Sequence, residues 1–242
     1  MKKLNLFFAL MCFSVFAFAQ PKGGVTWFDA GLKVKYGAAG LFNKALSDSP
    51  DYDFDLGLSG GFGIGARVGL NYDDHGLALE FMLNKGSQPM ENMIDNTTFD
   101  INWNTYDIYA LYRNSSNRGY FEIGPKYSLV NKVERDDPGD NTVDMTDDFQ
   151  NYLSGVIGFG ANLMGSETFF GMLGLRIEYG FTDAMTNIGR TNGSPVSDPN
   201  IYATDSNIST NLAFAGIVFE LNWGIGYYAK AGCGQRSKMM KF

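Results

Sequence analysis

Carboxylates are the most concentrated reactive groups of this sequence, and seven of them lie between Glu134 and Asp148. Clustered carboxylate oxygens bind Ca²⁺ or Mg²⁺, and such an ion can be shared with nearby phosphates. We therefore consider, as a hypothesis, a divalent-cation site in this segment. Its ligands would come from Asp136, Asp137, Asp140, Asp144, Asp147 and Asp148.

Three other motifs lack the pattern that their chemistry needs. The acidic run 51–55 begins like a calcium loop, but Gly57 comes one position late and Phe62 replaces the closing glutamate. The glycines of 60–69 (GGFGIGARVG) alternate with other residues, and no helix follows, unlike a phosphate-binding loop. His75 is the single histidine, and its segment Asp-Asp-His-Gly predicts a tight turn. We expect neither an enzyme nor a cofactor.

The composition favours a β architecture. Of 242 residues, 45% are hydrophobic, 15% are aromatic and only 19% are charged, with 30 glycines. The net charge of -7 argues against a nucleic-acid partner, because phosphate contacts require a basic face.

The first residues are expected to be removed. In 1–19, two lysines precede an apolar run that ends in Ala17-Phe18-Ala19, the pattern of a secretory signal peptide. Cleavage would leave Cys233 as the single cysteine. The mature chain would then consist of a barrel over 20–228 and a basic tail over 229–242.

The mature chain alternates between apolar and polar residues with period two, which is typical of β-strands. Tight and long connections alternate along the chain, as they do in an antiparallel up-and-down sheet. Strands are predicted at 25–36, 58–72, 77–84, 99–113, 120–130, 152–163, 168–182 and 213–228, with long loops at 37–57, 85–98, 131–151 and 183–211.

The two faces of these strands differ. One face is apolar with aromatic residues near the strand ends, as lipid contact requires, and the other is rich in glycine and balanced charges, as a narrow barrel interior requires. We therefore predict an all-β fold, an eight-stranded antiparallel up-and-down transmembrane β-barrel in the bacterial outer membrane. Its interior charges would be Asp29, Lys33, Lys35, Arg67, Glu80, Asp107, Arg113, Glu122, Lys126, Arg176, Glu178 and Glu220.

Four segments, TYDIYALYR, GYFEIGPKYSL, YLSGVIGFGANL and LRIEYGFTD, resemble strands of the PorT-like outer-membrane β-barrels of Bacteroidota. The resemblance implies an integral outer-membrane protein with the same eight-strand layout. The chain departs from the family pattern at Tyr109, where a proline is frequent, and in the 14 residues that follow Tyr228.

These observations predict a protein with a structural or surface-interaction role. The tight turns and both termini would face the periplasm, and the acidic loops would face outward. Its partners would be outer-membrane lipid, lipopolysaccharide and a surface or periplasmic protein. An eight-stranded barrel is filled by its own side chains, so no open pore is expected. The alternative is a soluble periplasmic lipocalin-like barrel that binds an apolar ligand.

Overall fold

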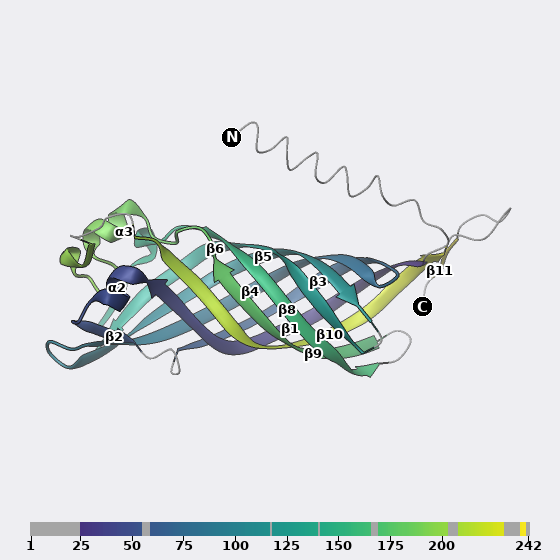
Figure 1. Ribbon diagram of the computed structural model, residues 1–242, viewed down its shortest axis with the longest axis horizontal. Coiled ribbons are helices and arrows are strands. Elements are labelled where there is room, and N and C mark those ends of the chain that lie inside the picture. Colours follow the sequence, from purple (N-terminus) through teal and green to yellow (C-terminus); the bar gives the residue numbers. More distant parts are fainter. Residues whose placement is uncertain are drawn as a thin grey trace, which may run out of the picture.

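The computed structural model describes residues 25–54, 59–116, 118–139, 141–165, 169–202, 208–229 and 238–240. Long antiparallel strands form a closed, elongated barrel (Figure 1). The expected signal peptide and Cys233 lie outside the described residues.

Eight long strands make the ring, and each pairs with its neighbours along the chain. The first and last of them close it, in a register that runs from Val25 opposite Ala229 to Asn43 opposite Thr210. This confirms the predicted fold class. The strands are β1 (Val25–Asn43), β3 (Gly60–Tyr72), β4 (His75–Asn92), β5 (Thr97–Ser115), β6 (Gly119–Asp137), β8 (Tyr152–Gly165), β9 (Phe169–Gly180) and β10 (Thr210–Ala229).

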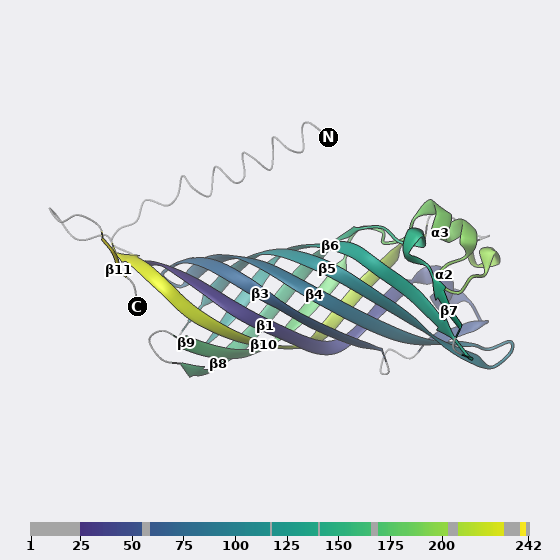
Figure 2. The same ribbon diagram turned by 180° about the vertical axis from the view of Figure 1, so that it is seen from behind.

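Shorter elements lie at the two ends of the barrel, as the two opposite views show (Figures 1 and 2). We call the end with the short helices the loop end and the opposite end the turn end. Among the described residues, no helix is long and apolar enough to cross a membrane. The loop end carries α2 (Lys44–Asp48), β2 (Tyr52–Phe54), β7 (Asn141–Asp144), η1 (Thr146–Asp148), α3 (Asn187–Asn192) and η2 (Pro199–Tyr202), and the turn end carries β11 (Lys238–Met240).

Several strands are longer than predicted. The expected loop 85–98 is wrong, because β4 and β5 extend through it and leave only 93–96 as a turn. In 131–151, β6 continues to Asp137 and pairs with β7. The expected tail likewise contains β11, which pairs with the end of β10.

The reason why β4, β5 and β6 are longer than predicted is that their two faces exchange character toward the loop end. On β4, Leu79, Phe81 and Leu83 point outward in the middle of the barrel, and Lys85 and Ser87 take their place toward the loop end. The inward positions change in the opposite sense, from polar to apolar. The alternation of the strand therefore continues, but its outer face becomes polar and its inner face becomes apolar. A prediction that requires the same face to stay apolar ends the strand too early.

The loop end has a hydrophobic core inside the barrel wall. Such an arrangement, apolar inside and polar outside, is that of a water-soluble β-domain. The barrel therefore combines a lipid-facing middle with a loop end built for water. Buried members of this core include Leu41, Leu46, Met90, Ile101, Trp103, Val133, Phe149, Met185, Leu212 and Phe214.

Candidate functional site

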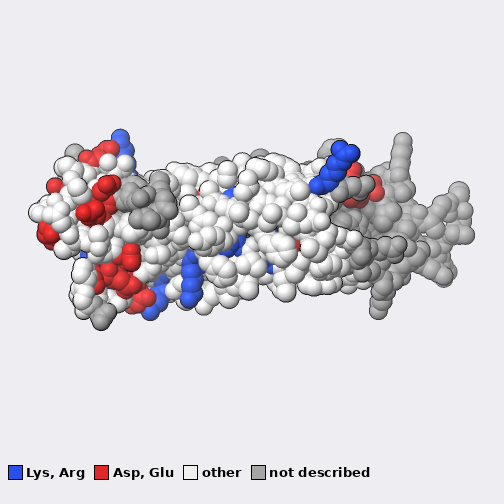
Figure 3. Space-filling view, turned by 90° about the horizontal axis from the view of Figure 1, so that it is seen from below, with Lys and Arg blue, Asp and Glu red and all other residues white. Residues whose placement is uncertain are grey.

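The structure places all twelve of the proposed interior charges inside the barrel. Each of these residues is at most 5% exposed. The outer surface shows the complementary pattern, because the middle of the barrel is almost free of charge and acidic residues gather at the loop end (Figure 3). Strict alternation produces this arrangement, since inward and outward residues follow one another on each strand.

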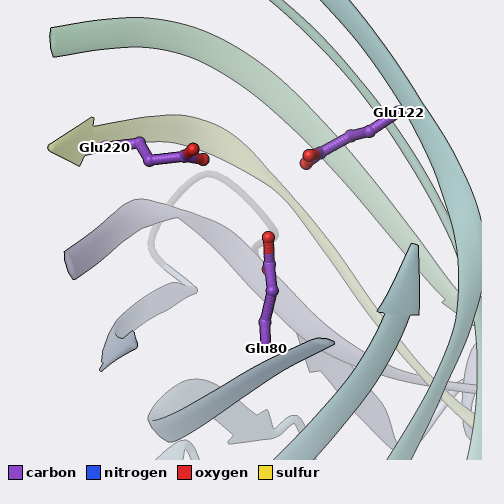
Figure 4. A group of neighbouring side chains, drawn as sticks. All are labelled: Glu80, Glu122 and Glu220. Atoms are coloured by element: carbon purple, nitrogen blue, oxygen red, sulfur yellow. The ribbon is translucent and has the colours of Figure 1, made fainter. Parts of the chain in front are cut away.

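Three glutamates from different strands meet in the interior (Figure 4). Glu80 lies on β4, Glu122 on β6 and Glu220 on β10, and one carboxylate oxygen from each lies within 4.8 Å of the other two. Carboxylates at this separation repel one another unless cations neutralise them. Three acids this close are also a potential metal site, so the neighbouring bases decide their role.

Four bases surround these glutamates. Arg113 donates to both Glu220 oxygens, with Nη1 2.6 Å from Oε1 and Nη2 2.7 Å from Oε2, and to Glu122 Oε2 at 2.6 Å. Arg176 Nη1 lies 3.0 Å from Glu80 Oε2. Lys33 and Arg67 approach Glu220 at 2.8 and 2.9 Å.

These four bases balance four acids, the three glutamates and Asp29. Arg176 also pairs with Glu122, and Lys33 with Glu80. The glutamate triad is therefore the centre of a neutral ion-pair network, in which its carboxylates pair with arginine and lysine side chains. Buried pairs of this kind are stable when both partners are present and costly when one is removed.

A second network lies next to the first. Glu178 accepts from Lys35 Nζ at 2.8 Å and from Lys126 Nζ at 2.8 Å, and Tyr109 Oη lies 3.1 Å from Glu178 Oε1. Asp107 lies 3.2 Å from Lys126. Two bases again face two acids. Both networks are electrically balanced without an additional ion.

Glycines make room for these side chains. A Cβ at position 174 would collide with the hydroxyl of Tyr120, and a Cβ at position 63 would collide with Asn84. Glycine is therefore a packing requirement of the interior at both positions.

The acids of the proposed cation site do not converge among the described residues. Asp136 accepts from Asn102 Nδ2 and Thr142 Oγ1, both at 2.7 Å. Asp137 pairs with Arg135 at 2.8 Å. Within the described part of the chain, the group of three acids with closely spaced ligand atoms is instead the interior glutamate triad.

The remaining members of that proposed site have separate roles. Asp144 accepts from the Thr146 hydroxyl and amide, which hold the pKa of the Asp144 carboxyl below its usual value. Asp148 is buried and accepts from Asn192 Nδ2 at 2.7 Å and from the Ser194 hydroxyl. Asp147 is exposed, and Asp140 lies outside the described residues.

A hydrogen-bonded centre holds the loops over the loop-end core. Tyr202 donates to the Ser194 carbonyl at 2.7 Å and accepts from Asn43 Nδ2 at 3.0 Å. Asn43 also caps α2 and binds Thr210. Burial raises the pKa of Tyr202 to about 12. The loops at this end are thus fixed to strands β1 and β10.

His75 is the first residue of β4 and is exposed. Its Nδ1 lies 2.6 Å from Tyr112 Oη, and the two rings stack. The predicted turn of four residues, 73–76, is therefore two residues shorter than expected, with Asp73 and Asp74 as its central residues.

Sequence reasoning did not identify several interior polar residues. Asn84 and Asn222 are buried and bind Asp107 and Arg67, and Gln88 is buried and accepts from the Leu41 amide. All three lie at even spacing from Glu80 or Glu220, so the same alternation would have found them. The loop-end core was also missed, because its strands had been interpreted as loops.

A closed antiparallel barrel with an apolar outer band and an ion-paired interior defines an integral membrane β-barrel. The chain belongs to the outer membrane protein beta-barrel domain family, which matches residues 6–214. It is an integral protein of the bacterial outer membrane, and the soluble periplasmic alternative does not hold. Small outer-membrane barrels of this kind are generally not enzymes.

Solved structures similar to this chain include other small outer-membrane proteins. OprG from Pseudomonas aeruginosa has 10% sequence identity and a TM-score of 0.41, over 84% of this chain and 96% of OprG. Neisserial surface protein A has 14% identity and a TM-score of 0.38, over 81% of this chain and 97% of that protein. Ail of Yersinia pestis, solved with a heparin analogue, has 10% identity and a TM-score of 0.36, over 80% of this chain and 99% of Ail. A comparison with curated proteins gives no match.

Proposed function

We propose that this protein is a sealed, non-enzymatic outer-membrane barrel of the PorT-like type from Bacteroidota, whose loop end presents an acidic surface to a partner outside the cell. The observation that carries the proposal is that two layers of side chains, one after the other along the barrel axis, fill the interior. Two balanced ion-pair networks occupy the middle, and an apolar core occupies the loop end. We therefore expect that both layers block the passage of ions.

Reconstitution into planar bilayers tests the sealed interior. We expect no stable single-channel conductance from the natural protein. A matched pair of variants adds a control: Glu178→Ala opens the middle layer only, and Trp103→Ala opens the loop-end core only, so each alone should also remain closed. Steady conductance of the natural protein would contradict the proposal.

The lipid contact of the loop end is proposed from a row of bases. Asn104 on β5 is the cross-strand neighbour of Lys85 on β4 and of Lys132 on β6. Both lysines are exposed. The row lies where the outer surface changes from apolar, at Leu83 and Tyr106, to polar. That is the level of lipid head groups, so these lysines are suited to the phosphates of lipopolysaccharide.

Lipopolysaccharide retained by the purified protein measures this contact. Replacing both lysines, Lys85→Gln with Lys132→Gln, should reduce the retained amount severalfold. The matched control is Lys230→Gln with Lys241→Gln, which removes two lysines from the tail. Equal retention in the two double variants would exclude the lysine row as the lipid contact.

The partner surface is proposed from the acids of the loops. Asp48, Asp51 and Asp198 line one groove at the loop end together with Lys44. Crosslinking on intact cells should capture a partner, and Asp48→Asn with Asp51→Asn should weaken the capture. Asp73→Asn with Asp74→Asn, which removes two acids from the turn end, is the control. Loss of capture in the control but not in the loop variant would contradict the proposed orientation.

A further inference from the structure

The outer surface of the barrel carries a groove near the turn end. It crosses β3, β4, β5 and β6, which lie side by side (Figure 2). Its volume is about 580 Å³, within the size range of small-molecule sites. Apolar side chains line it, and the hydroxyl of Tyr112 is the polar side-chain group among them. The groove therefore suits a hydrocarbon chain.

The strand register produces the groove. It runs between two rows of outward side chains that are two residues apart on each strand, a separation of about 7 Å. Cross-strand neighbours form each row. The row nearer the turn end is Leu70, Leu77, Tyr112 and Ile123, and the other row is Val68, Leu79 and Ala110. Ala110 has the smallest side chain of the two rows, so the groove is open beside it.

A polar cluster lies at the turn-end side of the groove. His75 and Asn114 are cross-strand neighbours there. His75 Nδ1 lies 2.6 Å from Tyr112 Oη and 3.1 Å from Asn114 Nδ2. An amide nitrogen only donates, so Nδ1 accepts, and the proton of the neutral ring lies on Nε2. His75 is exposed and thus carries an N–H donor at the end of the groove.

An arginine adds positive charge on the same side. Arg118 lies in the short connection between β5 and β6 and is exposed. The outer surface changes here from apolar, at Leu77 and Tyr112, to polar, at His75 and Asn114. This change marks the level of the lipid head groups. Hydrogen-bond donors and a positive charge at that level are suited to a phosphate.

We propose that the groove binds one phospholipid, with an acyl chain between the two rows and the phosphate at His75, Asn114 and Arg118. Charge complementarity favours this occupant, because a phosphate joined to hydrocarbon matches donors beside an apolar groove. The acids of the neighbouring turn, Asp73 and Asp74, line a separate cavity. The site lies at the turn end and is independent of the partner surface and the lysine row at the loop end.

Titration of the refolded, delipidated mature chain in detergent with dioleoyl phosphatidylglycerol tests the site, and native mass spectrometry counts the bound lipid. We expect one tightly retained phospholipid per barrel. Ala110→Trp fills the groove and should weaken binding at least tenfold. His75→Phe keeps an aromatic ring beside Tyr112 but removes the donor. It should weaken binding about tenfold, as the loss of one hydrogen bond to a charged group does.

Dioleoylglycerol, which has the same chains and no phosphate, separates the two parts of the site. Its binding should fall in Ala110→Trp and stay unchanged in His75→Phe. This second comparison tests the proposal even if Ala110→Trp does not refold. The matched control is Ala215→Trp, the same substitution at an exposed position of β10, which should bind both lipids like the natural protein.

Three results would overturn the proposal. Equal binding of phosphatidylglycerol to Ala110→Trp and Ala215→Trp would exclude the groove as the site. An unchanged affinity of His75→Phe for phosphatidylglycerol, or an equal loss for both lipids, would exclude the placement of the phosphate. A dimer that Ala110→Trp dissociates, with no lipid retained by the natural protein, would assign the groove to a second copy of the chain.

Discussion

Glu178 is one carboxylate shared by two lysines deep in the barrel. The variant Glu178→Gln keeps the shape of the side chain but leaves Lys35 and Lys126 with Asp107 as the remaining acid of their network. Because an uncompensated buried charge is costly, we expect a loss of about 3–5 kcal/mol in the free energy of unfolding in lipid vesicles. The control is Glu134→Gln, whose partner Lys132 is exposed, so that water screens the pair and the loss should be much smaller. Equal losses would contradict the interior network.

Tyr202 gives the loop end a dependence on alkaline pH. Its pKa is raised to about 12 in the folded protein, against about 10 in an unfolded chain. A raised pKa means that the unfolded state loses this proton first, so the stabilisation is complete below pH 10 and is lost between pH 10 and 12. Limited proteolysis of the loops across this range should show opening that the variant Tyr202→Phe lacks. An identical pH profile in both proteins would exclude Tyr202 as its source.

On the strands, a single substitution that introduces a charge tests the lipid-facing band. Leu175 lies in the middle of β9 and is 48% exposed on the outer surface. Leu175→Arg should cost about 2–4 kcal/mol of stability in bilayers, because an arginine there must enter hydrocarbon. Thr98→Arg, on the outer face of β5 beyond the apolar band, should be close to neutral in the same refolding assay. A neutral Leu175→Arg would mean that the two faces have been assigned the wrong way round.

The strands also show what sequence could and could not reveal. Where lipid covers the outer face, the alternation of Leu79, Glu80 and Phe81 identifies both the strand and its inner face. Beyond the lipid, toward the loop end, the same strand carries Lys85 outside and Met90 inside. Sequence reasoning that expects an apolar outer face along the whole strand therefore interprets this segment as a loop. Pairings between distant residues, such as Arg113 with Glu220, are set by barrel closure and cannot be obtained from local pattern.

The whole molecule has three layers along its axis, each suited to a different surrounding. The loop end has an apolar core and polar outer walls, as in water, and the middle has apolar outer walls around paired charges, as in lipid. The turn end is formed by short connections between strands and contains a cavity lined by Asp29, Asp73 and Asp74. Because the middle layer is stabilised only when all its charges are paired, the barrel is expected to fold as one unit.

The orientation of these layers is the last prediction. The ring of eight strands places the end of β10, Ala229, at the turn end, and Cys233 follows Ala229 by four residues in the sequence. If the turn end faces the periplasm, a membrane-impermeant maleimide should leave Cys233 unlabelled in intact cells and should label it after the outer membrane is permeabilised. Thr98→Cys in a Cys233→Ser background is the matched control, because its loop-end cysteine should be labelled in intact cells. Labelling of Cys233 without permeabilisation would mean that the barrel is inserted the other way round, with its acidic loops in the periplasm.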